Sequence, residues 1–450
     1  MIRRRILAAV TCVWVILAAA LAARLAFAWE QQRRIPHQVL RTVPFAYEPG
    51  NIAYSVVTGH GYASPFHTET GPTAWEAPVY PLMLAGFFKM FGLYSLGAFA
   101  AAAGCNILFS SLACVPIFFA GRRVAGIGVG AGAAWLWAVF PNGVILPFEW
   151  IWDTSLSGLL GATILWATLK LGAASEEREE ARVPSTGRWC AYGLLWGFTL
   201  MTNPAFVSLL PLMLVWLAWR GWRARGEGAA VATGARASLA GPAASLAIAI
   251  LCCVPWTVRN YEALGSFVPL RSNLGLELWL GNNAEYRETW PGWLHPIDNT
   301  SERKEYARMG EIAYMREKRE EAIDFILTHP AWEARLFVTR AVTVWVGSAA
   351  PWWQFREAKR PVVRLALVSN FLATVGTIAG LVILFWRRNE YALAVAAFVV
   401  VFPLPYYWTR PLLRYRHPVD SAVMLLCAVA IGEVVRWALR ERGGVSARTA

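Results

Sequence analysis

The stretch PFAYEPGNIAYSVVTGHGYASPFHTETGPTAWEAPVYP, from Pro44 to Pro81, lies between strongly apolar segments and is rich in Gly, Pro, Tyr and polar residues. The apolar run before it covers residues 6–28, and comparable runs follow along the rest of the chain. Each is near the ~20 residues that a helix needs to cross the hydrocarbon core of a bilayer. The pattern predicts a helical membrane chain whose first span leads into a long polar loop.

Composition supports this fold class. The chain has 450 residues, of which 57% are hydrophobic and 24 are Trp, and this is too apolar for a single soluble domain. A hairpin of two shorter runs is split by the sequence TNP at residues 202–204. We therefore predict an all-α polytopic membrane protein with about ten spans, at residues 6–28, 94–120, 124–146, 151–171, 189–202, 204–219, 238–257, 363–386, 390–408 and 418–437.

The orientation follows from the basic residues near the span ends, which remain in the cytoplasm. Arg3, Arg4 and Arg5 place the N-terminus inside, so the long loops fall on the outer face. The formal charge of +13 is then explained by anchoring to anionic lipid, and no nucleic-acid partner is expected. Three units are predicted. Residues 1–257 form an N-terminal transmembrane module that includes a first outer loop at 30–93, residues 258–360 form an outer region, and residues 361–450 form a C-terminal transmembrane module.

Two segments leave alternatives open. Residues 26–28 form a small-x-small pattern typical of signal-peptide cleavage, but the uninterrupted apolar core of residues 6–23 exceeds the usual ~7–15 residues and favours a retained anchor. Residues 332–350 are apolar but carry three charged side chains. This segment is re-entrant, interfacial or spanning, and if it spans, the topology after it inverts.

Other local patterns predict smaller features. Residues 301–328 have the pattern of a surface helix with Tyr306 and Tyr314 near one face, and residues 78–92 that of an amphipathic helix at the membrane interface. The seven cysteines lie in apolar runs, which argues against disulfides in the outer loops and against a thiolate metal site. They are Cys12, Cys105, Cys114, Cys190, Cys252, Cys253 and Cys427.

The first outer loop contains a candidate catalytic carboxylate. Glu48 is the only acid between residues 31 and 67, and it precedes a predicted helix start with Pro49 in the first turn. A carboxylate beside a helix N-terminus keeps its charge and can accept a proton from a hydroxyl group. The alternative is a helix cap or a solvated loop residue, and Glu69 and Glu76 compete for the catalytic role.

A second acid, Asp153, lies at the outer edge of a predicted span. Acidic side chains near a span face the protein interior or water, because exposure to lipid costs ~2.5–3.5 kcal/mol. Asp153 is therefore a candidate site residue, and its alternative role is to cap a helix that begins near Thr154.

Basic residues gather on the outer side, where the orientation rule expects few. The planar fork of Arg binds phosphate or pyrophosphate through two hydrogen bonds, and a lipid-linked phosphate is such a partner. Contact with ordinary lipid headgroups is the alternative. The residues are Arg259, Arg271, Arg410, Arg414, Arg416 and His417.

Three motifs, GPTAWEAPVYPLMLAGFFKMFG, PWTVRNYEALGSFVPLRSNLGLELWLGNN and RYRHP, together resemble bacterial membrane glycosyltransferases of the GT-C fold. More narrowly, the chain resembles glycosyltransferase family 39, which is related to protein O-mannosyltransferases and to the aminoarabinose transferases that modify lipid A. The resemblance covers essentially the whole chain. It implies a bundle of about 10–11 transmembrane helices with outer-face loops and interfacial helices.

The resemblance also implies a function: inverting transfer of a sugar from a polyprenyl-phosphate donor to a hydroxyl of a protein, lipid A or a glycan, at the outer face of the inner (cytoplasmic) membrane. Glu48 occupies the place of the catalytic base, where the family commonly has Asp or an Asp-Glu pair, and Asp153 matches a second acidic position. Arg414 and Arg416 match donor-phosphate contacts, with Arg271 or Arg259 in support. Candidate substrate-binding residues are Tyr54, His60, Asn273 and His417.

No cofactor is predicted. The leaving group is an anion held by Arg, so the reaction does not demand a metal, and no metal-ligand spacing stands out. A divalent metal is compatible with related folds but is not indicated.

Two other functions remain as alternatives. A transporter or flippase of lipid-linked sugars is expected to have charged or broken helices near the middle of the membrane, and the predicted spans are nearly free of both. A non-catalytic subunit of envelope polysaccharide assembly gives no reason for acids and arginines to share one face. The sequence identifies neither the sugar nor the acceptor.

Overall fold

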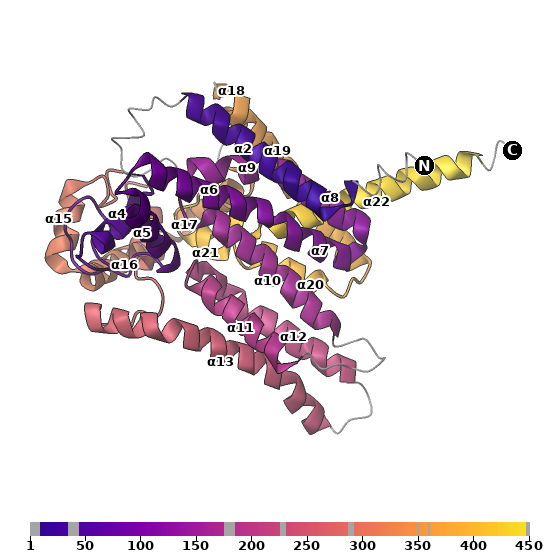
Figure 1. Cartoon of the computed structure of the whole chain (residues 1–450), viewed down its shortest axis with the longest axis horizontal. Coiled ribbons are helices and arrows are strands. Elements are labelled where there is room, and N and C mark those ends of the chain that lie inside the picture. Colours follow the sequence, from indigo (N-terminus) through magenta and orange to yellow (C-terminus); the bar gives the residue numbers. More distant parts are fainter. Residues whose placement is uncertain are drawn as a thin grey trace.

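The computed structural model describes residues 10–34, 45–174, 185–225, 231–286, 292–348, 351–358 and 361–446, and this part of the chain is helical without a β-strand. Figure 1 shows long helices lying side by side in a bundle, with shorter helices gathered at one end. The bundle helices are α2 (Val13–Arg34), α6 (Leu96–Leu112), α7 (Cys114–Ala125), α8 (Ile127–Val139), α9 (Pro141–Glu149), α10 (Thr154–Ala174), α11 (Thr186–Leu200), α12 (Leu210–Arg225), α13 (Val231–Leu264), α19 (Pro361–Trp386), α20 (Ala392–Val400) and α22 (Asp420–Ser446).

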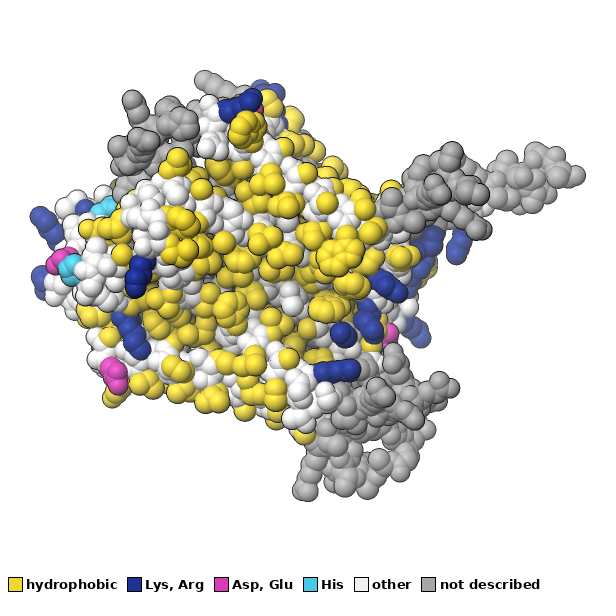
Figure 2. Space-filling model, viewed as in Figure 1, with side chains coloured by type: hydrophobic (Ala, Val, Ile, Leu, Met, Phe, Trp, Pro, Cys, Tyr) yellow, Lys and Arg dark blue, Asp and Glu magenta, His cyan; other side chains and the backbone are white. Residues whose placement is uncertain are grey.

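Seven helical segments of the described chain are long and apolar enough to cross a membrane, and the bent pair α8 and α9 makes an eighth if it forms one span. Figure 2 shows a broad belt of hydrophobic side chains across these helices, with Lys and Arg gathered where the C-terminal part of α22 lies. The predicted all-α polytopic membrane fold is confirmed. The seven segments are Val13–Arg33, Leu96–Ala125, Thr154–Ala173, Pro204–Arg223, Ser238–Leu264, Pro361–Trp386 and Leu413–Arg440.

Two of the ten predicted spans are shorter helices. The run at 189–202 forms α11, which has 15 residues and ends at Leu200, just before the predicted TNP break. Pro204 then begins a short 3-10 turn that the side chain of Asn203 caps. The run at 390–408 is divided into α20 and α21 (Leu404–Trp408), with Pro403 at the start of α21. Proline cannot donate a helical hydrogen bond, so each break follows from the sequence.

Close helix packing forms the centre of the bundle. A Cβ atom on Gly130 of α8 would lie 2.5 Å from the carbonyl oxygen of Phe118 in α7, and one on Gly121 would lie 2.9 Å from Gly130. Small residues let two helix backbones approach in this way where lipid supplies no hydrophobic driving force.

The arginines at residues 3–5, on which the predicted orientation of the N-terminus depends, lie outside the described residues.

The shorter helices form an outer layer from two distant parts of the chain. The layer contains α4, α5, α15 and α16, which gather at one end of the bundle in Figure 1, and α14, which packs against α16. Glu311 joins the two parts, because its carboxylate accepts hydrogen bonds from Ala74 N (2.7 Å), Thr73 and Tyr306. The bounds are α4 Tyr47–Val57, α5 Val79–Phe91, α14 Leu274–Gly281, α15 Thr300–Met309 and α16 Glu311–Thr328.

The prediction of one helix over residues 301–328 is wrong. Gly310 has a φ of 79°, which a right-handed helix does not allow, and it separates α15 from α16. The predicted apolar face is nevertheless present, since Tyr306 and Tyr314 are both fully buried. The helices predicted after Glu48 and over residues 78–92 are confirmed as α4 and α5.

The ambiguous segment at 332–350 forms α17 (Pro330–Val346), which is not among the seven long apolar segments. Its Arg340 is completely buried and lies 2.9 Å from Glu333. The same guanidinium donates to Gly281 O at 2.6 Å and to Asn282 Oδ1 at 3.0 Å. These charges therefore tie α17 to the end of α14.

The remaining short helix, α18, covers Pro351–Glu357. The seven cysteines are free thiols.

Candidate functional site

A cluster of acids and arginines lies where the outer layer meets the ends of α9 and α10. We call it the acid–arginine cluster: Glu48, Glu76, Asp153, Arg271 and Arg414. The charges of both arginines act on all three carboxylates, so the five side chains share one electrostatic environment. From the sequence, Glu48 and Asp153 are the catalytic candidates on this face, and Arg271 and Arg414 are phosphate-binding candidates. Glu76 is an alternative to Glu48 for the catalytic role.

The chain enters α4 in an unusual conformation that positions Glu48. Ala46 and Tyr47 have φ values of 67° and 40°, a region that non-glycine residues rarely adopt. The turn is tight, because a Cβ on Gly50 would lie 2.2 Å from the carbonyl oxygen of Phe45. Such backbone strain persists where the surrounding structure enforces it, and it clusters at functional sites. Here it brings Glu48 into the interior, with 5% of its surface exposed.

The side chain facing Glu48 is His295, which the sequence did not indicate because it is an isolated His in a turn-rich segment. His295 Nε2 lies 3.6 Å from Glu48 Oε1. His295 Nδ1 accepts a hydrogen bond from the backbone N–H of Ile297 (3.1 Å), so the neutral ring carries its proton on Nε2, toward the carboxylate. Phe66 and Trp75 pack edge-on against the ring and fix its orientation.

Burial sets the protonation of this pair. It raises the pKa of Glu48 to about 7, although Arg414 and Arg271 favour the charged form. It lowers the pKa of His295 to about 3, with a further contribution from Arg410, so the imidazole is neutral at pH 7. Glu48 therefore titrates near neutral pH, as a general base requires.

Glu76, the competing acid from the same loop, is held by Arg271. Arg271 Nη2 lies 3.1 Å from Glu76 Oε1, and Arg271 Nε donates to Trp75 O at 2.9 Å. Burial raises the pKa of Glu76 to about 8, and the nearby charges of Asp153 and Glu48 act in the same direction. The third acid of the loop, Glu69, lies on the surface, so it is outside the cluster.

Asp153 lies at the start of α10, inside the acid–arginine cluster. It directly precedes α10, and its Oδ2 accepts a hydrogen bond from Ser157 Oγ at 2.8 Å. Asn203, from the break after α11, donates to the same hydroxyl at 3.3 Å. Burial raises the pKa of Asp153, while Arg271 and Arg414 act to lower it. Asp153 is thus fixed at the helix start and still faces both guanidiniums.

Arg414 is positioned by aromatic rings and not by a carboxylate. Its guanidinium carbon lies 4.6 Å from the ring centroid of Trp150 and 4.2 Å from that of Trp152. Tyr47 packs against both tryptophans from the start of α4. Arg414 Nε is buried and makes no hydrogen bond within the described chain. The rings support the guanidinium, and its Nε–H is a candidate donor to an anionic ligand.

Arg416 and His417, predicted in the same motif, are placed differently. Arg416 is completely buried and donates to Asp420 Oδ1 and Asn370 Oδ1, each at 2.6 Å, and to Trp345 O. His417 is also fully buried, with Nδ1 3.4 Å from Asp420 Oδ2. These contacts join the start of α22 to α19 and α17, so only Arg414 of the two arginines acts in the acid–arginine cluster.

Replacing Arg416 with Ala is expected to destabilise the protein by about 3–5 kcal/mol, because Asp420 would remain buried without its partner. Thermal unfolding in detergent measures this, with Arg223→Ala as the control, since Arg223 is exposed at the end of α12. An Arg416→Ala variant as stable as the control contradicts the structural role.

The remaining candidates also lie outside the cluster. Arg259 donates to the backbone oxygens of Thr73 and Tyr62, so it fastens the first outer loop. Tyr54 stacks on Tyr94, and His60 is near Glu69 on the surface. Asn273 is buried at the start of α14, two residues after Arg271. In the described residues, no three His, Cys, Asp or Glu side chains lie together as a metal would require.

The helical bundle and its outer layer were compared with known proteins. The sequence matches no protein-family model and no curated protein. Among solved structures, the chain is similar to the apo oligosaccharyltransferase of Archaeoglobus fulgidus, with a TM-score of 0.57, 13% identity, and coverage of 97% of this chain and 52% of that one. The same enzyme in complex with an inhibitory peptide and a dolichol-phosphate gives a TM-score of 0.55 at 13% identity, with the same coverage.

A third structure, of that enzyme tethered to an acceptor peptide, gives a TM-score of 0.52 at 13% identity and covers 94% of this chain and 49% of that one. The present chain therefore spans about half the length of the oligosaccharyltransferase. At this level of identity the likeness establishes the fold alone. The narrower resemblance to glycosyltransferase family 39 stays a prediction.

Proposed function

We propose that this protein is an inverting glycosyltransferase that moves a sugar from a polyprenyl-phosphate donor to a hydroxyl acceptor at the outer face of the inner membrane. One observation carries the proposal: the buried carboxylate of Glu48 shares a cluster with Arg414, whose Nε–H has no hydrogen-bond partner within the described chain. The fold supports it, because an oligosaccharyltransferase of this architecture binds a dolichol-phosphate.

Glu48 is the base in this proposal. It removes the proton from the acceptor hydroxyl while the acceptor oxygen attacks the anomeric carbon of the sugar. The bond between that carbon and the phosphate oxygen breaks, and the polyprenyl phosphate leaves with the bonding electrons. Glu48 suits this role better than its neighbours, since Arg271 holds Glu76 and Ser157 holds Asp153.

Arg414 stabilises the negative charge that develops on the leaving phosphate, through donors already held in place by Trp150 and Trp152. Arg271 balances the negative charge of Glu76 and adds to the positive electrostatic potential around the phosphate. Asp153 orients the acceptor or the sugar. His295 is a positioning residue: its Nε2–H faces Glu48 and favours the ionised carboxylate that the base role requires.

The direct test is transfer of radiolabelled sugar from a purified polyprenyl-phosphate donor in liposomes containing the protein. Release of the sugar from the lipid to a hydroxyl acceptor supports the transferase. Labelled lipid that crosses the bilayer unchanged supports the flippase instead. Comparing acceptors of protein, lipid A and glycan type then identifies the acceptor class.

The transfer rate is expected to rise with pH. The base must be deprotonated, and burial raises the pKa of Glu48 to about 7. Below about pH 7, kcat/KM should therefore fall about tenfold for each pH unit, and above it the rate should level off. Initial rates between about pH 5 and 9 measure the profile. A rate that increases on acidification would mean that Glu48 does not act as the base.

A further inference from the structure

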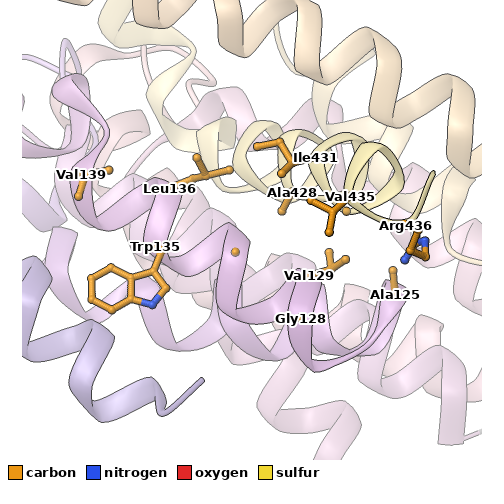
Figure 3. Close-up of a pocket in the computed structure, with 12 residues that line it drawn as sticks. Ala125, Gly128, Val129, Trp135, Leu136, Val139, Ala428, Ile431, Val435 and Arg436 are labelled. Carbon is orange, nitrogen blue, oxygen red and sulfur yellow. The ribbon is translucent and has the colours of Figure 1, made fainter. Parts of the chain in front are cut away.

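A groove on the lipid-facing side of the bundle lies away from the acid–arginine cluster. It runs between α8 and α22, has a volume of about 660 Å³, and is lined by apolar side chains except for Arg436 at one end. Figure 3 shows Arg436 beside Ala125 at that end and Trp135 toward the other. Val139, Ile431 and Val435 along it are each more than half exposed. In a bilayer, such a groove is open to lipid chains.

The glycines of the groove are not explained by helix packing. A Cβ on Gly128 would meet nothing within 4 Å, and one on Gly132 would meet only Ala428 Cβ, at an ordinary 3.5 Å. Gly130, on the packed face of the same helix, has no such room. Glycine costs a helix about 1 kcal/mol relative to alanine, so Gly128 and Gly132 weaken α8 without improving its contacts. What they provide is the open space of the groove.

The polar end of the groove carries a net positive charge. Arg436 Nη2 lies 2.6 Å from Glu433 Oε2, and Arg387 pairs with the same carboxylate. Two guanidiniums thus share one carboxylate. Arg436 Nε is buried and makes no hydrogen bond within the described chain.

This end also lies far from Arg414. Arg436 is 16 residues beyond Asp420 on α22, which is about 24 Å along the helix axis. A donor whose phosphate binds at Arg414 cannot place the same phosphate here. The basic end is on the side predicted to face the cytoplasm, where anionic lipid headgroups meet basic pockets between transmembrane helices.

We propose that this groove binds an anionic phospholipid of the cytoplasmic leaflet, with an acyl chain along α8 and α22 and its phosphate against Arg436. The apolar walls exclude a soluble anion as the ligand. The Arg436 guanidinium at one end of the groove distinguishes this site from a uniformly apolar surface, which would contact any lipid. The proposal is independent of the glycosyltransferase function, because it concerns the opposite end of the bundle.

Photolabelling of the purified full-length protein tests this. The probes are phosphatidylglycerol and phosphatidylcholine that carry the same diazirine-bearing acyl chain, and mass spectrometry locates the labelled peptides. Phosphatidylglycerol is expected to label peptides of α8 and α22 about fivefold more strongly than phosphatidylcholine does. Arg436→Gln should reduce that labelling to the phosphatidylcholine level, and Gly132→Leu, which fills the groove, should remove labelling by both probes.

Matched controls come from elsewhere on the membrane surface. Gly104→Leu adds a side chain at an exposed glycine of α6 with open space around it, and Arg223→Gln removes an exposed arginine. Neither should change the labelling. Equal labelling by both probes that is insensitive to Arg436→Gln, or labelling that survives Gly132→Leu, overturns the proposal. Cross-links between two copies of α22 would show that a second chain occupies the groove and would overturn it as well.

Discussion

Replacing Glu48 with Gln is expected to lower sugar transfer by about 10²–10⁴-fold, the range that a positioned general base contributes. Glutamine keeps the shape of the side chain but cannot take a proton from the acceptor hydroxyl. Because burial already disfavours the charged carboxylate, the neutral amide should fold at least as well. The measurement is radiolabelled transfer in liposomes, together with thermal unfolding of the same preparation.

Glu69→Gln is the matched control, because Glu69 belongs to the same outer loop and is exposed on the surface. It should transfer at the wild-type rate. Full activity in Glu48→Gln would remove the base role, and Glu76→Gln would then be the next variant to examine. If both variants at positions 48 and 76 were active, Asp153 would be the remaining acid of the cluster to test as the base.

Arg414→Ala is expected to lower kcat/KM by about 10²–10³-fold, since it removes the group that stabilises charge on the leaving phosphate. Arg414→Lys should recover only part of this. Lysine keeps the positive charge, but it cannot lie flat between Trp150 and Trp152 or present two parallel N–H groups to a phosphate. Titration of the donor under conditions of excess acceptor measures both effects.

Arg308→Ala is the control here, because Arg308 is exposed in the same outer layer and pairs with its neighbour Glu305. It should leave transfer unchanged. If Arg414→Ala retained normal kcat/KM for the polyprenyl-phosphate donor, the leaving phosphate would have to bind elsewhere. Arg410, buried at the other end of the same loop, would then be the candidate to test.

The fold was largely predictable because lipid imposes a simple rule on the sequence. A helix must be apolar over the width of the bilayer, so eight of the ten predicted runs correspond to long helices or to the bent pair α8 and α9. The break before Pro204 followed from the chemistry of proline. The helix at 301–328 was predicted too long because the helical spacing of apolar residues continues through Gly310. Only the backbone conformation of Gly310 shows the break.

The site was predictable only in part. Glu48 and Asp153 could be found because acids are rare near apolar spans, and Arg414 because it violates the orientation rule. The same rule also selected Arg416, which the structure pairs with Asp420. A sequence cannot distinguish an arginine that serves the fold from one that serves a ligand, because both depart from the orientation rule in the same way. His295 was missed because its significance depends on contact with Glu48, which lies far away in the chain.

The order of these residues along the chain matters during synthesis. Glu48, Glu76 and Asp153 leave the ribosome before Arg271, and Arg271 leaves it before Arg414. A nascent chain therefore contains the acids well before it contains the group that would grip a lipid-linked donor. The outer layer is complete only when Glu311 has met Thr73 and Ala74. Under the proposed function, a growing polypeptide therefore has no complete reaction centre before that contact forms and transfers no sugar.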